Sequence, residues 1–293
     1  MTREDLTVRS GSDDCAAWLY RPVAPAGPVP CIVMAHGFSM TRHDGLDEYA
    51  ATFVAAGVAV LVIDHRHLGD SGGALRQRFR ADEQAADVRA AIGVARGLDG
   101  VDPDRIVLWG FSFAGGTAVD VAATDPRVAG LVLVCPFLDG RARVLGTLRR
   151  TPVVALRVMA AAIRDLSGRH TTIPVTGPPG SLAAMAFEGE AEGFAAAARD
   201  GSPWRNEISP GAFATVAFHR PVRRAARLRM PVWVCLGEDD ITVSRSAVEQ
   251  LASRAPRAEL HRYRVDHFGP CLPPHQSAIA ADQADWIRRT ILA

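Results

Sequence analysis

The chain has 293 residues, of which 48% are hydrophobic and 22% charged, and its formal net charge is +1. This length and composition fit one large soluble α/β domain, or two small ones, with enough chain to bury a substantial core. With a near-neutral net charge and no block of like charges, nothing argues for nucleic acid or an anionic membrane as a partner, and we expect neither. All 33 basic residues are arginine, which excludes a lysine nucleophile or a Schiff-base mechanism.

Five cysteines lie far apart, at Cys15, Cys31, Cys135, Cys235 and Cys271. They form neither a CxxC pair nor a Cys/His spacing typical of a metal site, so we expect free thiols in a reducing compartment. The N-terminal segment MTREDLTVRS is polar and lacks a signal-peptide core. No apolar run approaches the ~18–20 residues that span a bilayer. We therefore expect a cytoplasmic protein that needs no metal and no cofactor.

Apolar runs alternate with amphipathic stretches through the first half of the chain. The sequence predicts buried strands over 30–35, 58–64, 105–109 and 129–135, and helices over 46–56, 81–97 and 113–123. Strands that are apolar throughout and alternate with helices are typical of a parallel sheet covered on both faces. Residues 5–22 alternate more loosely, and we expect an antiparallel hairpin there at one edge of the sheet.

The pattern breaks between Arg141 and Arg229, where no strand is evident. This segment contains a helical piece over 152–165, a Pro/Gly-rich loop over 174–181 and an Ala-rich stretch over 182–199. The sheet pattern then resumes, with strands expected over 231–236 and 258–264 and helices over 244–254 and 275–291. We therefore predict a core made of residues 1–140 and 230–293, with residues 141–229 inserted as a lid.

The stretch IVLWGFSFAGG places Ser112 where the strand over 105–109 meets the helix over 113–123. G-x-S-x-G at such a join is the pattern of a nucleophile elbow, a turn so tight that small residues are needed two positions either side of the serine. Gly110 and Ala114 occupy those positions, and alanine is the mildest departure from the strict pattern. Gly115 and Gly116 are expected to let the helix start close to the neighbouring backbone. Ser112 is therefore the candidate nucleophile.

A serine nucleophile needs a base, and the base needs an acid that orients it. In this architecture the chain order is serine, acid, histidine. The strand over 231–236 ends in Gly237-Glu238-Asp239-Asp240, and His267 follows the last strand. Carboxyl ends of parallel strands face one crevice, so Asp240 and His267 are the candidate acid and base, with Asp239 left open as the alternative acid.

These motifs resemble those of α/β-hydrolase-fold serine hydrolases over roughly residues 5–291. His36-Gly37-Phe38 is similar to the family's HG-x turn, and the segment from Asp64 to Gly72 to its D-x-R-x-x-G-x-S loop. The resemblance favours Asp240 as the acid, because Gly237–Asp240 matches the family's G-x-x-D segment. It also implies an oxyanion hole formed by the backbone N–H groups of Phe38 and Phe113.

The resemblance implies an α/β-hydrolase fold, with a mostly parallel sheet and a helical lid. It also implies an enzyme that cleaves a small-molecule ester or thioester through an acyl-enzyme on Ser112. The sequence further resembles a bacterial and fungal branch of esterases, thioesterases and peptidases. The apolar, Ala-rich lid favours an apolar acyl group or a natural-product-like substrate. Oligomeric state, including a homodimer, stays open.

Other interpretations of the same residues stay open beside this one. The same three residues could serve a peptidase or amidase, an acyltransferase or a C–C bond hydrolase, and a non-catalytic binding protein is the alternative of another class. We expect His36 to hold the oxyanion loop. His65 and His67 lack a third ligand at metal-site spacing. We expect His219, His261 and His275 to be ordinary surface or loop histidines.

Overall fold

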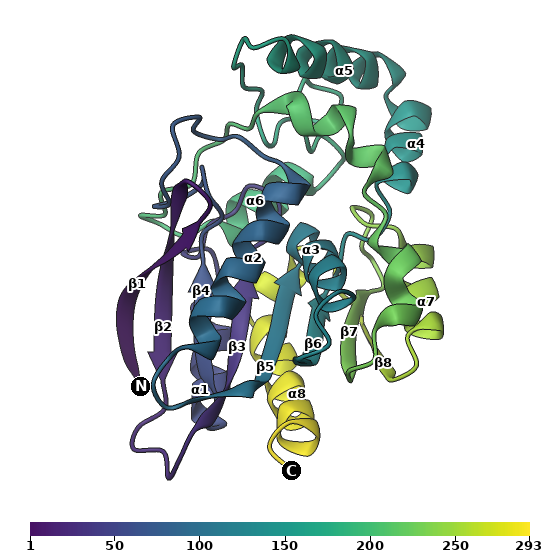
Figure 1. Cartoon of the computed structure of the whole chain (residues 1–293). Coiled ribbons are helices and arrows are strands. Elements are labelled where there is room, and N and C mark those ends of the chain that lie inside the picture. The colour runs from purple at the N-terminus through teal and green to yellow at the C-terminus, as the bar shows by residue number, and fades with distance from the viewer.

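The computed structural model describes the whole chain, Met1–Ala293. One sheet of eight strands organises it, in the order β1-β2-β4-β3-β5-β6-β7-β8 (Figure 1). The strands are β1 (Thr2–Ser10), β2 (Asp13–Arg21), β3 (Val29–Ala35), β4 (Ala59–Ile63), β5 (Val101–Phe111), β6 (Val128–Val134), β7 (Val232–Gly237) and β8 (Ala258–Tyr263).

Strands β3 to β8 run parallel, and β2 joins β4 antiparallel with β1 outside it. The mostly parallel sheet and the antiparallel hairpin at its edge are therefore both confirmed. The β5 strand is longer than the expected 105–109, because its pairing with β3 begins at Val101, before the apolar run. The β5 strand lies in the middle of the sheet, and at its carboxyl end the chain turns into α3 (Phe113–Ala122), the next helix.

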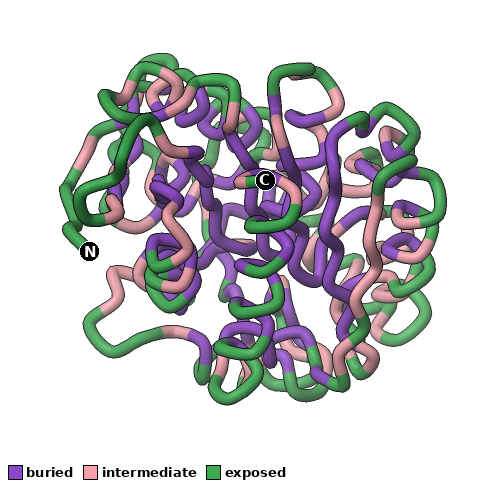
Figure 2. The backbone as a smooth tube through the Cα atoms, turned by 90° about the horizontal axis from the view of Figure 1, so that it is seen from below, coloured by how far each residue is buried: buried purple, intermediate pink, exposed green.

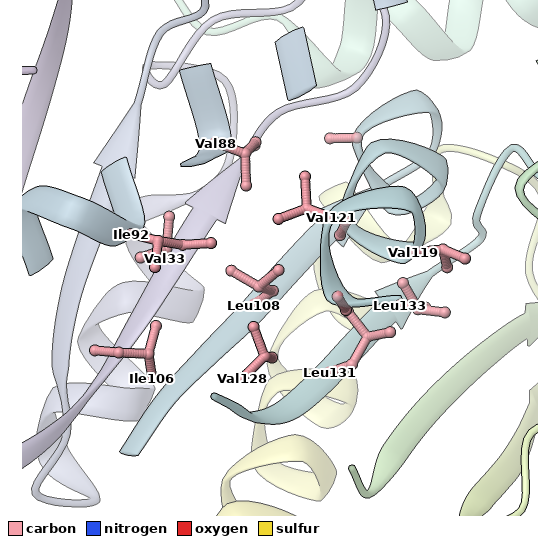
Figure 3. Close-up of a cluster of buried hydrophobic side chains, with 14 of the residues drawn as sticks. Val33, Val88, Ile92, Ile106, Leu108, Val119, Val121, Val128, Leu131 and Leu133 are labelled. Carbon is pink, nitrogen blue, oxygen red and sulfur yellow. The ribbon is translucent and has the colours of Figure 1, made fainter. Parts of the chain in front are cut away.

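Helices cover both faces of this sheet. They are α1 (Asp47–Ala55), α2 (Ala81–Arg96), α3 (Phe113–Ala122), α7 (Arg245–Arg254) and α8 (His275–Thr290). Helices α2, α3 and α7 pack on one face, where Leu108 of β5 lies among side chains such as Val88 and Val121 (Figure 3). Helices α1 and α8 cover the other face, around Trp109 and Trp286.

The two faces bury clusters of nearly equal size, 39 and 38 residues, so the sheet lies in the middle of the core. Seen from below, buried segments gather toward the centre of the molecule and exposed segments toward its periphery (Figure 2). All five cysteines are buried as free thiols, which fits their expected role as small apolar side chains. No helix combines the length and the apolar character that crossing a bilayer would need.

The segment between β6 and β7 contains no strand that joins the sheet. It contains α4 (Gly140–Arg150), α5 (Pro152–Leu166), α6 (Glu190–Ala197) and the 3₁₀ turns η1 (Pro210–Ala214), η2 (Val216–Phe218) and η3 (Pro221–Arg227). The sequence did not predict α4, which is rich in arginine and has one buried residue, Gly140. The last turn, η3, packs on the core helices α3 and α7.

Close backbone approach explains the glycine pair at the start of α3. A Cβ at Gly115 would lie 2.7 Å from the Pro136 side chain, and one at Gly116 would lie 2.3 Å from the Phe137 carbonyl oxygen. Both distances are shorter than any real Cβ contact, so the chain after β6 can pass over α3 only because these positions have no side chain.

We predict that Gly116→Ala destabilises the protein by about 1–3 kcal/mol, because the new methyl group displaces the backbone at Phe137. The matched control is Gly93→Ala in α2, where a Cβ meets nothing within 4 Å. That change should stabilise the protein by roughly 1 kcal/mol through helix propensity. Urea unfolding of both variants is the measurement, and equal effects of the two changes would contradict the steric account.

Candidate active site

Ser112 lies alone between β5, which ends at Phe111, and α3, which begins at Phe113. Its backbone has φ 53° and ψ −117°, a combination that costs a non-glycine residue about 1–3 kcal/mol. The turn is tight enough that a Cβ at Gly110 would lie 2.5 Å from the Ala114 carbonyl oxygen. The strained turn lifts the Ser112 side chain above the carboxyl end of the sheet, as the elbow pattern predicts.

The structure brings the three predicted catalytic residues into one hydrogen-bonded chain. The Nε2 atom of His267 lies 2.9 Å from Ser112 Oγ, and its Nδ1 atom lies 2.7 Å from Asp240 Oδ2. The side chains of His267 and Asp240 are only 4% and 1% exposed. With Nδ1 donating to Asp240, Nε2 faces Ser112 as the acceptor of its hydroxyl proton. The neighbouring Asp239 is exposed, and it is Asp240 that contacts the imidazole.

The carboxylate of Asp240 is kept ionised by its surroundings. Burial raises its pKa, but the charge and hydrogen bond of His267 outweigh burial, together with the N–H groups of Val243 and Thr242. Those two N–H groups donate to Asp240 Oδ1 at 3.1 and 2.8 Å. The net result is a pKa below the ordinary aspartate value, so the group beside His267 carries a negative charge at neutral pH.

The turn after β3 lies directly beside the serine. A Cβ at Gly37 would lie 3.3 Å from Ser112 Cβ. The ring of His36 is buried, which lowers its pKa to about 3, so it is a neutral imidazole. It donates from Nδ1 to the Gly37 carbonyl at 2.9 Å and accepts from the His65 N–H at 3.3 Å. His36 thus holds the loop, as expected.

Two backbone N–H groups are available next to Ser112. The planar trans peptide that carries the Gly37 carbonyl also carries the Phe38 N–H, which points the opposite way. The Phe38 N–H donates no hydrogen bond to a backbone acceptor. Phe113 is the first residue of α3, where an N–H has no carbonyl one turn back to receive it. The residues predicted for an oxyanion hole therefore lie on either side of the serine.

A cavity of about 800 Å³ opens over Ser112, and most of the residues that line it are hydrophobic. Its inner wall is a chain of rings: Phe38 meets Phe79 edge to face, and Phe79 meets Phe113, both with centroids 4.7 Å apart. Its outer wall comes from the segment between β6 and β7, through residues such as Val144, Val158 and Phe213. The cavity can therefore hold a large apolar group against the serine.

The expectation that His219 is an ordinary surface or loop histidine is wrong. Its side chain is only 9% exposed, lines the cavity and stacks on the ring of Phe113 with centroids 4.7 Å apart. Burial lowers its pKa to about 4, with the nearby Arg224 acting in the same direction. The loop after η2 returns to α3 where Gly116 leaves room. In the sequence, the glycine pair indicated a close neighbour of this helix, but it did not identify His219 as that neighbour.

A second feature absent from the sequence prediction joins the inserted segment to the loop between β7 and α7, residues 238–244, which carries Asp240 and is called the acid loop below. Glu190 of α6 is buried and pairs with Arg143 of α4 through two contacts of 2.8 and 3.1 Å. The same carboxylate accepts from Thr242 Oγ1 at 3.0 Å. Thr242 is also the residue whose N–H binds Asp240. The inserted segment and Asp240, the candidate acid, are thus connected through one threonine.

The loop after β4 is held by ion pairs. Asp64 is buried and pairs with the guanidinium of Arg42, which also pairs with Asp70 at 2.9 Å. His65 lies 3.4 Å from Asp87. Although His43, Asp64 and Asp70 come within reach of one cation, Arg42 already supplies the positive charge between the two carboxylates.

We predict that His219→Phe reduces the loss of stability in acid. The folded pKa of about 4 lies below the ordinary value of 6.5, so the unfolded chain binds more protons between them. The neutral ring therefore contributes to stability at pH values above the ordinary pKa of 6.5. This contribution is lost as the pH falls toward the folded pKa.

From about pH 7 to about pH 5, the variant should lose roughly 1–2 kcal/mol less than the wild type. Phenylalanine keeps the stack on Phe113, and the other charged neighbour, Asp120, lies 3.7 Å from the ring. Urea unfolding at the two pH values is the measurement, with His275→Gln at an exposed position as the control. If His219→Phe lost as much stability between the two pH values as the wild type, the lowered pKa of His219 would be contradicted.

Comparison with known proteins shows the family to which this chain belongs. A family model described as "Serine aminopeptidase, S33" matches residues 26–268. The quorum-quenching protein AidA of Acinetobacter baumannii is 34% identical over 98% of this chain and 95% of its own length. The polyketide transferase grgF of a Penicillium species is 30% identical over 71% of this chain and 66% of its own length.

A shorter match, to the thiohydrolase aneE of Aspergillus aculeatus, is 37% identical over 39% of this chain and 36% of the relative. Among solved structures, the α/β hydrolase GrgF from Penicillium superposes over all of both chains with a TM-score of 0.84 at 22% identity. That likeness shows the fold. Since the family model covers most of the chain and AidA aligns over nearly all of it, the protein belongs to the serine aminopeptidase S33 family of α/β-hydrolases.

Proposed function

We propose that this protein is a serine hydrolase that cleaves a carboxylic ester or thioester through an acyl-enzyme on Ser112. The observation that carries the proposal is the chain from Ser112 through His267 to Asp240, set at one side of a largely apolar cavity. A serine hydroxyl is a weak nucleophile unless a base takes its proton, and the imidazole nitrogen at 2.9 Å is placed to do so.

In the first half of the reaction, Ser112 Oγ attacks the acyl carbonyl carbon while His267 Nε2 takes the hydroxyl proton. The imidazolium that results is stabilised by ionised Asp240, which also holds the ring in the orientation that the reaction needs. His267 then gives the proton to the leaving alcohol or thiol. In the second half, water attacks the acyl-enzyme by the same route, and Ser112 regains its proton.

The negative charge that forms on the carbonyl oxygen needs donors in place beforehand. The N–H groups of Phe38 and Phe113 are our candidates, since they flank Ser112 and the first has no backbone acceptor. The N-terminus of α3 adds its partial positive charge at the same point. Such a donor is worth about 3–4 kcal/mol in the transition state. His36 acts indirectly, by holding the peptide that carries the Phe38 N–H.

The size and lining of the cavity support a substrate with an apolar acyl group. The segment 141–229 would act as the lid that roofs it, and substrate selection would depend on that segment more than on the core. Relatives named as thiohydrolases support a thioester as the bond cleaved, and the quorum-quenching relative supports a small-molecule substrate.

Acyl transfer is a second candidate for the same three residues. Relatives named as polyketide transferases and an acyltransferase favour it. The first half of the reaction is the same, and the two activities differ in whether water or another nucleophile accepts the acyl group. Product analysis with an added alcohol or amine separates them: transfer should yield the new ester or amide faster than free acid.

The first test is a stopped-flow time course with p-nitrophenyl esters of increasing acyl length. We expect the wild type to give a burst followed by turnover, with kcat/KM rising with chain length because each buried methylene contributes about 0.8 kcal/mol. Ser112→Ala should lose the burst and roughly 10⁶-fold of kcat. Ser277→Ala, at an exposed serine of α8, is the control.

Labelling with a fluorophosphonate separates the possible failures. A wild type that neither turns over nor reacts with the probe would favour a non-catalytic binding protein. Labelling that persists in Ser112→Ala would show that another residue is the nucleophile.

The assignment of the acid can be tested with a matched pair of neighbours. Asp240→Asn should lower kcat by about 10³–10⁴-fold, because the amide disturbs the imidazole tautomer and cannot stabilise the imidazolium. Asp239→Asn, one residue away at an exposed position, should retain nearly full activity. Steady-state kinetics on both variants provides the comparison, and a larger loss in Asp239→Asn would reverse the assignment.

A further inference from the structure

The outward face of α5 is apolar, although it lies against solvent. Val153, Leu156 and Ile163 are 57%, 68% and 61% exposed, and with Ala160 they recur at the spacing of one helix face. The inward face is apolar too, since Val154 and Ala162 are the buried residues of this helix. A surface helix normally turns polar residues outward, so this face lacks a partner within the chain.

Arginines border this apolar face and give the helix pair a strong local charge. Residues 140–170, which contain α4 and α5, include seven arginines and one acidic residue, Asp165. Only Arg143 of the seven has a carboxylate partner, Glu190. Arg157 and Arg164 lie seven residues apart, and therefore on one side of α5, next to the exposed apolar residues. The net charge of the whole chain is only +1, so the rest of the molecule is net acidic.

The apolar face is continuous with the cavity over Ser112. Leu148 of α4 and Leu156, Met159 and Leu166 of α5 all line that cavity, and each is also between 39% and 68% exposed. One set of side chains therefore belongs both to the cavity wall and to the outer surface. An acyl chain that leaves an apolar phase along this face would not have to cross water to enter the cavity.

We propose that the α4–α5 face docks on an anionic lipid surface, contrary to the expectation drawn from the near-neutral charge of the whole chain, because the positive charge is concentrated on this helix pair. The exposed side chains of α5 would enter the acyl region, and the bordering arginines would contact the lipid phosphates, as in interfacial amphipathic helices. The cavity entrance would then face the lipid. This inference goes beyond the proposed function and does not depend on it, because lipid binding needs no turnover.

Charge and shape favour this occupant over two others. A second copy would bring two arginine-rich faces together, which is electrostatically unfavourable. The single carboxylate of the helix pair, Asp165, already accepts hydrogen bonds from Ser209 and Gly211. A protein partner would need a recess that matches a projecting helix, whereas a fluid lipid surface adapts to one. Figure 1 shows α5 at the end of the molecule farthest from the sheet, where it can meet a flat surface before the core does.

The test is co-sedimentation of the full chain with sucrose-loaded vesicles of phosphatidylcholine alone or of an equimolar mixture with phosphatidylglycerol. We expect binding to the mixed vesicles, and binding that weakens as salt is added. Val153→Glu combined with Ile163→Glu should lower the partition coefficient by at least about tenfold, because two exposed apolar side chains that would enter the lipid are replaced by anions. Neither residue lines the cavity.

Matched controls change the same chemistry elsewhere. Val23→Glu alters another exposed valine, 75% exposed, and should leave binding unchanged. Arg157→Gln with Arg164→Gln should weaken binding about tenfold or more, whereas Arg254→Gln with Arg257→Gln, two exposed arginines near α7, should not. Thermal unfolding of each variant confirms that it folds.

Three results would overturn the proposal. The first is no binding to mixed vesicles. The second is binding that the Val153→Glu/Ile163→Glu variant retains, which would place the contact elsewhere. The third is a wild-type dimer in sedimentation velocity that this variant abolishes, which would make the face an interface between copies.

Discussion

The strained backbone of Ser112 is the constraint on which the arrangement of the site depends. A positive φ at this residue makes the chain turn from β5 into α3 within one position, and this turn brings the hydroxyl and the helix N-terminus to the same point. The turn is tolerated because Gly110 and Gly115 have no side chains where backbone passes close by. The surrounding core, buried on both faces of β5, holds the strain in place. Neighbouring strands then deliver Asp240 and His267 to the same edge of the sheet.

Burial and charge act in opposite directions on the groups around that serine. Burial raises the pKa of Asp240, but the imidazole of His267 and the other hydrogen bonds to the carboxylate outweigh burial and keep it charged. His36 and His219 have no carboxylate within hydrogen-bonding distance, and burial lowers the pKa of both, so that both rings are neutral. One imidazole is thus paired with a carboxylate, while two others serve as uncharged supports for the turn after β3 and for Phe113. This division follows from which ring has an anion within hydrogen-bonding distance.

The inserted segment differs from the core in how it is held. The core is stabilised mainly by apolar side chains on two sheet faces, whereas α4 and α6 are tied to the acid loop through Arg143, Glu190 and Thr242. Asp165 ties the end of α5 to η1 through Ser209 and Gly211. These polar contacts hold the inserted helices in place. The apolar side chains of the helices can therefore line the cavity on one face and remain exposed to solvent on the other. The proposed substrate site and the proposed lipid-docking face both depend on that freedom.

Local pattern was enough to predict the strands, the tight turn at Ser112 and the candidate acid and base, because only a restricted set of residues fits a buried parallel strand or a tight turn. The choice of Asp240 over its neighbour already needed a family resemblance. Other features had no local signal: α4 is arginine-rich with a single buried residue, His219 was expected to be an ordinary surface or loop histidine, and nothing near Glu190 in the sequence indicates its burial. Their environments come from segments far apart in the chain that meet only after folding. The burial, the pKa and the hydrogen-bond partners of these residues depend on such long-range contacts, and the spacing of residues along the chain therefore does not predict them.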